Sequence, residues 1–478
     1  MRVLLWHGWL LEGSGSNVVT ARVTAALRSA GHDVLVLCQE RHAARFPFVD
    51  ATGTVDASVI SSLSPTGAAP ASGRAVFLTP DIGSLLPVFV VDEYEGFDVK
   101  RFVDLTDREL STYLDRNVSA LRSAATWFRP RAVIAGHAVP GAAVARRALG
   151  PDRYVGKVHG SDLEYAVRLQ DRYRELAREG LQGARAVVGP THEVLRRMAE
   201  LVPSFDGPTY VVAPGVDTSS FQPRSRREAL LDVADRLDAD PDTARGRPDA
   251  LDTRTAEASA AGHAGALDAL AHGYDQEVPD PGASSRLRAL AGWDGPLIGF
   301  FGKIIPQKGV ELLIDALGRL PGSIRCVIVG FGLHREHVAA LVRSRELSGR
   351  VTFTGRLDHR YAPDVLAALD VLVVPSVLEE AFGMVAAERA AAGALPLVAR
   401  HSGLAEVARA LEEAVRRPGR FSFEPGEGAA ARIADGVQSL LALPSAERER
   451  LRRTIRAFVG SEWTWERTSE RLLEAATG

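Results

Sequence analysis

Two glutamates, Glu380 and Glu388, are spaced so that they could bind the two ends of one elongated ligand. A helix predicted to begin near Gly383 places Glu380 just before its N-terminus and Glu388 in its second turn, roughly 12 Å away. Carboxylates accept paired hydrogen bonds from vicinal hydroxyls, and the N–H groups of Phe382, Gly383 and Met384 favour an anion at the helix end. A diol, a diphosphate and a second diol follow one another in a nucleotide sugar. The alternative is a helix that is simply capped by acids.

The loop of residues 302–309, which starts at Gly302, holds two of the four lysines in the chain, Lys303 and Lys308. The chain otherwise uses arginine, so a lysine kept against that bias favours a need for a compact ammonium group. Two ammonium groups in one loop repel each other unless a polyanion lies between them. A diphosphate meets that demand, and the alternative is a pair of solvated surface lysines.

Two further loops could hold a phosphate. Gly15 and Ser16 lie just before the first predicted helix, where free N–H groups and the helix dipole favour an anion. Residues 330–332 repeat the Gly-x-Gly pattern. Neither loop has the third glycine of a dinucleotide fingerprint, although Glu40 could stand in for the ribose-binding acid. An ordinary tight turn explains each loop equally well.

These loops belong to two segments of the chain that follow the same order of elements. Each runs strand, loop, helix, strand, at residues 3–6, 12–17, 18–29 and 34–37, and again at 297–301, 302–309, 310–320 and 326–329. The repeat predicts an α/β fold of two Rossmann-like, doubly wound domains that face a cleft.

We expect the domains at residues 1–205 and 206–459, the second with a helical or mobile insertion at about 224–285. That stretch is rich in Ala, Asp and Arg and poor in aromatic residues. Its Asp238-Ala239-Asp240 segment superficially matches a carboxylate metal motif. Because no apolar strand precedes it, a solvated helix face is the better interpretation.

Composition excludes several classes of function. The 478 residues carry 57 basic and 60 acidic side chains, so a net charge of −3 provides no global field to gather nucleic acid. Cys38 and Cys326 are far apart, which supports neither a disulfide framework nor a cysteine metal centre. No apolar run approaches the ~18 residues of a spanning helix, and the apolar start lacks a signal-peptide cleavage site. We therefore expect a cytoplasmic protein with at most peripheral membrane contact.

Taken together, these motifs make the sequence resemble the GT-B glycosyltransferases of family 4, the retaining group 1 enzymes. The resemblance is carried by the Glu-x7-Glu pair, the Gly-Lys-x4-Lys-Gly loop, and the segments 13–17, 158–161 and 214–217. It covers most of the chain apart from 224–285 and is strongest from Leu297 to Val407. It also implies a final helix, within 460–478, that completes the first domain.

By this resemblance the enzyme moves a sugar from a nucleoside-diphosphate sugar to an unidentified hydroxyl or amine acceptor, with retention and without metal or cofactor. UDP-sugars are favoured over GDP- or ADP-sugars as donors. The implied catalytic residues are Glu380, His159, Lys303 and Lys308. The implied donor-binding residues are Gly15, Ser16, Gly302, Arg356, Leu357, Phe382, Gly383, Met384 and Glu388. The expected acceptor-side residues are Asn17, Glu95, Lys100, His137 and Asp162.

Particular roles follow from the same resemblance. Glu380 would contact the donor sugar, Glu388 the ribose, and the two lysines of the 302–309 loop the diphosphate. His159 would contact the sugar or its phosphate, and the backbone around residues 356–357 would hold the base. For the segment around Lys100, packing is an equal alternative to acceptor binding.

The sequence departs from the family pattern in two places. Lys303 stands where the family more often has arginine, which replaces a bidentate fork with a point charge. Residues 401–406 stand where many members have Gly-Gly before the acid, so the pocket for the sugar differs. The alternatives are a sugar-nucleotide epimerase of the same fold, an NAD-dependent oxidoreductase and a sugar-nucleotide-binding protein without activity. The oligomeric state is not predicted.

Overall fold

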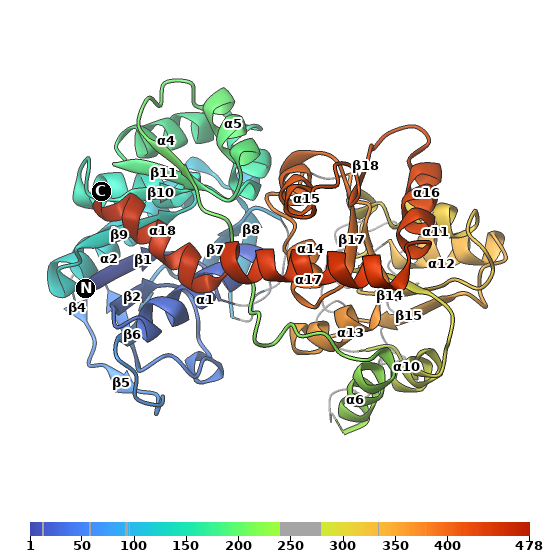
Figure 1. Ribbon diagram of the computed structural model, residues 1–478. Coiled ribbons are helices and arrows are strands. Elements are labelled where there is room, and N and C mark those ends of the chain that lie inside the picture. The colour runs from blue at the N-terminus through green and yellow to red at the C-terminus, as the bar shows by residue number, and fades with distance from the viewer. Residues whose placement is uncertain are drawn as a thin grey trace, which may run out of the picture. The chain divides into compact units, whose positions relative to one another are not determined.

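The computed structural model describes residues 1–11, 14–56, 59–90, 94, 96–239, 279–332, 334–377 and 379–478. The chain forms two compact units (Figure 1). Unit 1 comprises residues 1–215 and 463–478, and unit 2 comprises residues 216–462. Each unit is built around its own parallel sheet, which confirms the predicted α/β class.

The sheet of unit 1 has the strand order β12-β11-β10-β9-β1-β2-β6-β3-β4 in the described residues, and β5 also pairs with β3. Its strands are β1 (Arg2–Trp6), β2 (Asp33–Leu37), β3 (Ala51–Asp56), β4 (Val59–Ile60), β5 (Ser64–Pro65), β6 (Arg74–Pro80), β9 (Ala132–Gly136), β10 (Val155–Lys157), β11 (Ala186–Gly189) and β12 (Thr209–Val211). All pairs are parallel except those of β3 with β4 and β5. Because parallel strands covered on both faces bury every side chain, continuous aliphatic runs form the central strands.

The helices of unit 1 are α1 (Gly15–Ser29), α2 (Asp107–Phe128), α3 (Ala143–Leu149), α4 (Asp171–Gln182), α5 (His192–Leu201) and α18 (Trp465–Thr477). A separate two-stranded sheet pairs β7 (Leu85–Val88) with β8 (Asp98–Arg101). The last helix, α18, packs against α1 and β9, far from it in sequence (Figure 1). A Cβ on Gly215 would lie 2.4 Å from Trp465 N, so glycine lets the chain pass the start of α18. The final helix therefore belongs to unit 1.

The sheet of unit 2 has the order β15-β14-β13-β16-β17-β18 in the described residues, and all its pairs are parallel. Its strands are β13 (Leu297–Phe301), β14 (Arg325–Val329), β15 (Val351–Gly355), β16 (Val371–Val374), β17 (Leu395–Ala399) and β18 (Ser422–Phe423). The strand order reverses between β13 and β16, and ligands of open α/β sheets bind at the carboxyl ends of strands beside such a switch.

Helices α11 (Val310–Leu317), α12 (Arg335–Ser344), α13 (Ala362–Ala368), α14 (Met384–Ala391), α15 (Ser402–Val415), α16 (Ala429–Leu441) and α17 (Ser445–Glu462) also belong to unit 2. The helix that follows β13 begins at Val310, as predicted, but ends at Leu317 and not at residue 320. Among the helices in the described ranges, none is long and apolar enough to cross a bilayer.

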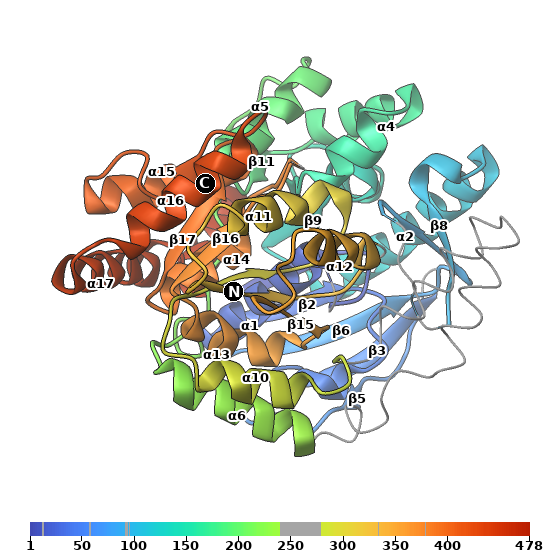
Figure 2. The ribbon, with the colours of Figure 1, turned by 90° about the vertical axis from the view of Figure 1, so that its right-hand side faces the viewer.

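Two further helices of unit 2, α6 (Arg226–Ala239) and α10 (Ala283–Ala291), lie side by side (Figure 2). The face of α6 that is buried carries Ala229, Leu230, Val233, Ala234 and Leu237. The two ends of the expected insertion at 224–285 are thus helical, and apolar side chains pack them into unit 2 despite their charged composition. Residues 240–278 lie outside the described ranges.

The structure also moves the expected boundary between the domains. Strand β12 pairs with β11, so the chain stays in unit 1 up to residue 215 and not only to 205. Asp238, in the segment that superficially matches a metal motif, lies at the end of α6 and forms an ion pair with Arg288 at 2.6 Å. Its partner in that motif, Asp240, lies outside the described residues.

Candidate functional site

In unit 2, the loop after β13 packs tightly against the loop after β14. Gly302 donates its N–H to the carbonyl oxygen of Val329 at 3.0 Å. A Cβ on Gly330 would lie 1.8 Å from the carbonyl oxygen of Gly302, and Gly330 has a φ of 151°. The Gly-x-Gly pattern at 330–332 is therefore explained by two backbones in close approach, without a dinucleotide.

The acid that could complete a dinucleotide site in unit 1 is used within the fold. Glu40 is buried, and its carboxylate accepts hydrogen bonds from the N–H groups of Leu11 at 3.2 Å and His42 at 2.8 Å. Both oxygens thus hold loop backbone, which accounts for this buried acid without a ribose. The structure removes the local support for an NAD-dependent oxidoreductase.

The lysine loop and the first glutamate meet at the edge of unit 2's sheet. They follow β13 and β16, which are neighbouring strands. Lys308 donates a hydrogen bond from Nζ to Glu380 Oε1, and 24% and 18% of the two side chains remain exposed. A Cβ on Gly309 would lie 2.2 Å from the carbonyl oxygen of Pro375, so glycine lets these two loops approach. An ammonium group and a carboxylate that face solvent are thereby placed side by side.

Lys303, the other lysine of this loop, takes a different partner. Its ammonium group lies 5.9 Å from the centre of the Phe331 ring, and the Arg356 guanidinium lies 5.3 Å from the same ring. Lys303 is exposed, whereas Leu357, next to Arg356, is buried. Two cations of unit 2 thus lie near one aromatic ring.

The segment from His401 to Gly403, noted as a departure from the family pattern, supports the Glu380 loop. Ser402 Oγ accepts a hydrogen bond from the Glu380 N–H at 3.0 Å, and the Gly403 N–H donates to the Glu380 carbonyl at 2.9 Å. His401 Nε2 donates to the carbonyl of Ser376 at 2.6 Å. Sequence reasoning assigned this segment no such role, because its contacts lie about twenty residues away along the chain.

The N-terminus of α14 lies between the two glutamates, as predicted. Gly383 has a φ of 95° and directly precedes Met384, the first residue of the helix. A Cβ on Gly383 would lie 2.4 Å from Leu404 Cδ2, and Phe382 is buried beside it. The first turn of α14 holds no acidic side chain, so its N–H groups stay suited to an anion.

Glu388 lies in the second turn of α14 and is only 4% exposed. His359 donates a hydrogen bond from Nε2 to Glu388 Oε1 at 3.0 Å. The His359 side chain is half exposed and lies in a single turn before α13. Sequence reasoning missed His359, since nothing in its neighbourhood distinguishes it from a surface histidine.

In unit 1, three imidazoles follow the adjacent strands β1, β9 and β10. The ring centres of His7 and His137 are 6.1 Å apart, and those of His137 and His159 are 4.2 Å apart. Burial lowers the pKa of His7 to about 4 and the pKa values of His137 and His159 well below the ordinary value. The positive charge of nearby Lys157 adds to this lowering. All three rings are therefore neutral near pH 7.

Asp162 and Asn17, both expected on the acceptor side, are turned into the fold. The Asp162 carboxylate is fully buried and accepts hydrogen bonds from the N–H groups of Ala138 at 2.6 Å and Gly160 at 2.8 Å. Burial raises its pKa, while these hydrogen bonds act in the opposite direction. Asn17 Oδ1 lies 2.8 Å from His7 Nε2. In this structure the two side chains hold the loops and the histidine in place, and their expected contact with an acceptor stays a prediction.

The start of α1 is open to a ligand. Ser14 caps the helix, accepting a hydrogen bond from the Asn17 N–H at 3.4 Å. A Cβ on Gly15 would meet no atom within 4 Å, and Gly15 is exposed while Ser16 is partly buried. The helix has no acid in its first turn. Gly13 lies outside the described residues.

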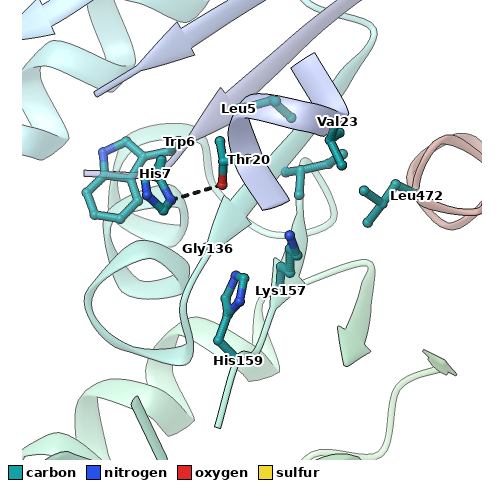
Figure 3. Close-up of a pocket in the computed structure, with 10 residues that line it drawn as sticks. Leu5, Trp6, His7, Thr20, Val23, Gly136, Lys157, His159 and Leu472 are labelled. Carbon is teal, nitrogen blue, oxygen red and sulfur yellow. Dashed lines mark hydrogen bonds between the residues drawn. The ribbon is translucent and has the colours of Figure 1, made fainter. Parts of the chain in front are cut away.

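Lys157 lies on β10 beside a small cavity in unit 1, with about 20 Å³ of space for the centre of a water molecule (Figure 3). Lining residues come from β1, α1, β9, β10 and α18 and from the loops after β1 and β10: Leu5, Trp6, His7, Thr20, Val23, Ile134, Gly136, Lys157, His159 and Leu472. This lining contains no carboxylate, and burial lowers the pKa of Lys157 to about 7. The scarcity of lysine singled out this residue, but its surroundings were not predictable.

Lys100 is the fourth lysine, and the structure gives it a structural partner. Its ammonium group donates to both oxygens of Glu109, at 2.9 and 3.1 Å, with about a third of each side chain exposed. Glu109 also closes the capping box of α2 with Thr106. The packing interpretation of this segment is thereby favoured over acceptor binding. Glu95 lies outside the described residues.

Comparison with known proteins identifies the family. A model described as "Glycosyl transferase 4-like domain" matches residues 14–215, and one described as "Glycosyl transferases group 1" matches residues 289–458. The chain belongs to the group 1 glycosyltransferases. The first match covers the sheet of unit 1 except for β1, and the second covers the sheet of unit 2. Residues 216–288, which include the segment that the sequence set apart, lie between the two matches.

The group 1 assignment agrees with individual relatives and solved structures. D-inositol 3-phosphate glycosyltransferases of Mycobacterium bovis and Mycobacterium tuberculosis are 30% identical over 214 residues, which is 43% of this chain. The match spans only 42% of the length of these curated relatives. Sucrose-phosphate synthase from Thermosynechococcus elongatus aligns with a TM-score of 0.63 and 17% identity, covering 99% of this chain and 97% of that one.

A second solved structure, Anabaena HepE in complex with UDP and glucose, aligns with a TM-score of 0.61 and 14% identity. The alignment covers 99% of this chain and 98% of HepE. Identities this low show the fold alone, and the GT-B fold of the group 1 glycosyltransferases is confirmed by it.

Proposed function

We propose that the chain transfers a sugar, with retention, from a nucleoside-diphosphate sugar to a hydroxyl or amine acceptor. The observation that carries this proposal is the pairing of Lys308 with Glu380 at the sheet edge of unit 2. Without a ligand, each group neutralises the other. A donor would exchange this contact for a phosphate on Lys308 and sugar hydroxyls on Glu380, so that one ligand satisfies both.

The leaving diphosphate would be stabilised by fixed positive groups of this chain. Lys303, Lys308 and the N-terminus of α14 lie on the loops that follow β13 and β16. As the bond between the sugar and the phosphate breaks, negative charge develops on the diphosphate, and preorganised cations lower the energy of that state. The acceptor oxygen bonds to the same face of the sugar, and its proton passes to the leaving phosphate. No divalent ion is needed in this scheme.

The far end of the donor would lie near Glu388. Its carboxylate is suited to a ribose diol, and its hydrogen bond with His359 fixes the orientation of the free oxygen. The backbone at residues 356–357 would hold the base. We favour a UDP-sugar as the donor, and the HepE structures, which carry UDP, UDP-glucose or glucose, support that preference by analogy of fold.

The acceptor would bind in unit 1, where His159 follows β10. A neutral imidazole can either donate or accept a hydrogen bond, which suits a contact with a sugar hydroxyl. We also propose a cytoplasmic location. Cys38 and Cys326 are both free and buried, as expected for a protein kept in a reducing compartment.

Replacing Lys308 with alanine tests the diphosphate role. We expect weaker binding of free UDP as well as of the UDP-sugar, and a loss of roughly 10²–10³ in transfer rate, the usual effect of removing one donor to a developing anion. Lys100→Ala is the matched control, because Lys100 pairs with Glu109 on the surface of unit 1. Affinity for each nucleotide is measured by calorimetry, and a thermal-shift panel of UDP-, GDP- and ADP-sugars selects the donor.

One result would contradict the proposed role of Lys308. If Lys308→Ala lowered affinity for the UDP-sugar but left free UDP unchanged, the lysine would not hold the diphosphate. Product analysis separates the remaining activities of the fold. A transferase releases nucleoside diphosphate only when an acceptor is present, an epimerase converts the donor alone, and a binding protein does neither.

A further inference from the structure

Three side chains close to unit 2's lysine loop form a cluster that the transfer reaction does not use. Glu311 lies in the first turn of α11, His334 directly precedes α12, and His337 lies in the first turn of α12. One carboxylate oxygen and one nitrogen from each ring lie within 4.8 Å of one another. Glu311 and His334 are partly buried, and His337 is exposed.

The arrangement of the rings goes beyond an ordinary ion pair. His334 Nε2 contacts Glu311 Oε1, which alone would make a simple histidine–carboxylate pair. The His337 ring, however, stacks on His334 with its centre 4.5 Å away and an angle of 22° between the planes. A third ligand atom is thereby brought to the same place, on a side where solvent can deliver an ion.

The chemistry of the three groups selects a class of ion. Two imidazoles and one carboxylate are the ligands of many three-residue zinc sites, in which water takes the fourth tetrahedral position. Magnesium and calcium prefer all-oxygen sets, so they fit this cluster poorly. The three ligand atoms lie within 4.8 Å of one another, and turning one imidazole out of the stack would let all three reach about 2 Å from one ion.

We propose that Glu311, His334 and His337 bind a divalent transition-metal ion of the zinc class. The ion would join the N-terminal turns of α11 and α12. The His334 N–H donates to the carbonyl of Ile304 at 3.1 Å, so the site lies against the backbone of the loop that carries Lys303 and Lys308. The ion would stabilise the starts of these two helices and take no part in the transfer step.

Metal binding is measured directly on the full, untagged chain, freed of metal by chelation. We expect zinc chloride to bind in calorimetry with one ion at this cluster and to raise the melting temperature. His337→Ala should lower zinc affinity at least about tenfold, as loss of even an outer partner of a metal ligand does. Glu311→Gln should do the same. His192→Ala is the matched control, because His192 is an exposed histidine at the start of α5 in unit 1.

The substitution at His337 removes an exposed side chain, so the fold should be retained, and circular dichroism checks this. Cobalt(II) offers a second readout, since its visible absorption reports nitrogen and oxygen ligands in a tetrahedral site and should be lost in His337→Ala. The proposal is overturned if the wild-type chain binds no zinc. It is also overturned if zinc affinity is unchanged in both His337→Ala and Glu311→Gln. Neither result depends on whether the chain transfers a sugar.

Discussion

Replacing Lys157 with methionine should stabilise unit 1, most strongly at low pH and least at high pH. Lys157 lines a small cavity that holds no carboxylate among its lining residues, and methionine keeps a similar length without the charge. Burial lowers the pKa of the ammonium group to about 7 from an ordinary value of 10.5. The charged form is therefore disfavoured in the folded chain relative to the unfolded one.

The magnitude follows from the two pKa values. At about 1.4 kcal/mol per pKa unit, the difference between 10.5 and about 7 corresponds to at most about 5 kcal/mol. Above pH 10.5, the ordinary pKa that applies to the unfolded chain, the amine is neutral in both states and its burial no longer destabilises the fold. Between the two values the unfolded chain binds the extra proton, so stability falls as the pH falls, by about 1.4 kcal/mol per pH unit. Below about pH 7 the folded chain is protonated too, and the cost is complete.

Urea unfolding of wild type and Lys157→Met at about pH 6, pH 8 and pH 10 measures this difference. The stabilisation in the variant should be a few kcal/mol near pH 6 and should shrink steadily toward pH 10. Lys100→Met serves as the control, because a surface ion pair such as that of Lys100 with Glu109 contributes less than about 1 kcal/mol.

A stability difference between wild type and Lys157→Met that stays constant with pH would refute this reasoning. Destabilisation of the variant at every pH would refute it as well. Either result would mean that the ammonium group finds a compensating partner in the folded chain, and the cavity would have to be interpreted as a built cation site.

Three further predictions concern the loops and the reaction. Gly383→Ala should destabilise unit 2 by about 1–3 kcal/mol and weaken donor binding, because the new Cβ would clash with Leu404 and Gly383 has a φ of 95°. Urea unfolding and UDP calorimetry measure these effects, and an unchanged unfolding midpoint would contradict the prediction. Asp162→Asn should lower the free energy of unfolding by about 2–3 kcal/mol, because the amide cannot accept all the hydrogen bonds that backbone N–H groups donate to the carboxylate. An unchanged free energy of unfolding would contradict the positioning role of Asp162. Addition of a chelator should leave the transfer rate within about twofold, as expected where fixed cations replace a metal. A loss of activity that magnesium restores would exclude that scheme.

The pieces of the candidate site that could be predicted from sequence are those set by local geometry. Glu380 and Glu388 were placed around a helix start because their spacing and Gly383 are properties of one short segment. The strand at 297–301 and the lysine loop after it follow from an aliphatic run that ends in glycine. Apolar strands and their small-residue ends are local features, and the helices between them follow a regular period.

The pieces that could not be predicted depend on contacts across the chain. The partners of Glu380 on α15, and of Glu388 at His359, lie 22 and 29 residues away. Asp162 was expected on the acceptor side, yet the structure buries its carboxylate against loop backbone. Similarly, the packing of α6 against α10 and α13 through its apolar face was not predictable from its charged composition.

The sequence by itself determined that this chain forms two parallel α/β sheets, and that acids and lysines gather at strand ends in its second half. Backbone periodicity and short-range spacing are enough for that, since each motif is complete within about ten residues. Only the tertiary structure decided which charges are paired. Lys308 forms an ion pair with Glu380, and Lys100 forms one with Glu109. Lys157 lines a cavity whose lining residues include no carboxylate. The charge state of a side chain depends on its burial and on the charged groups near it, and tertiary packing sets both.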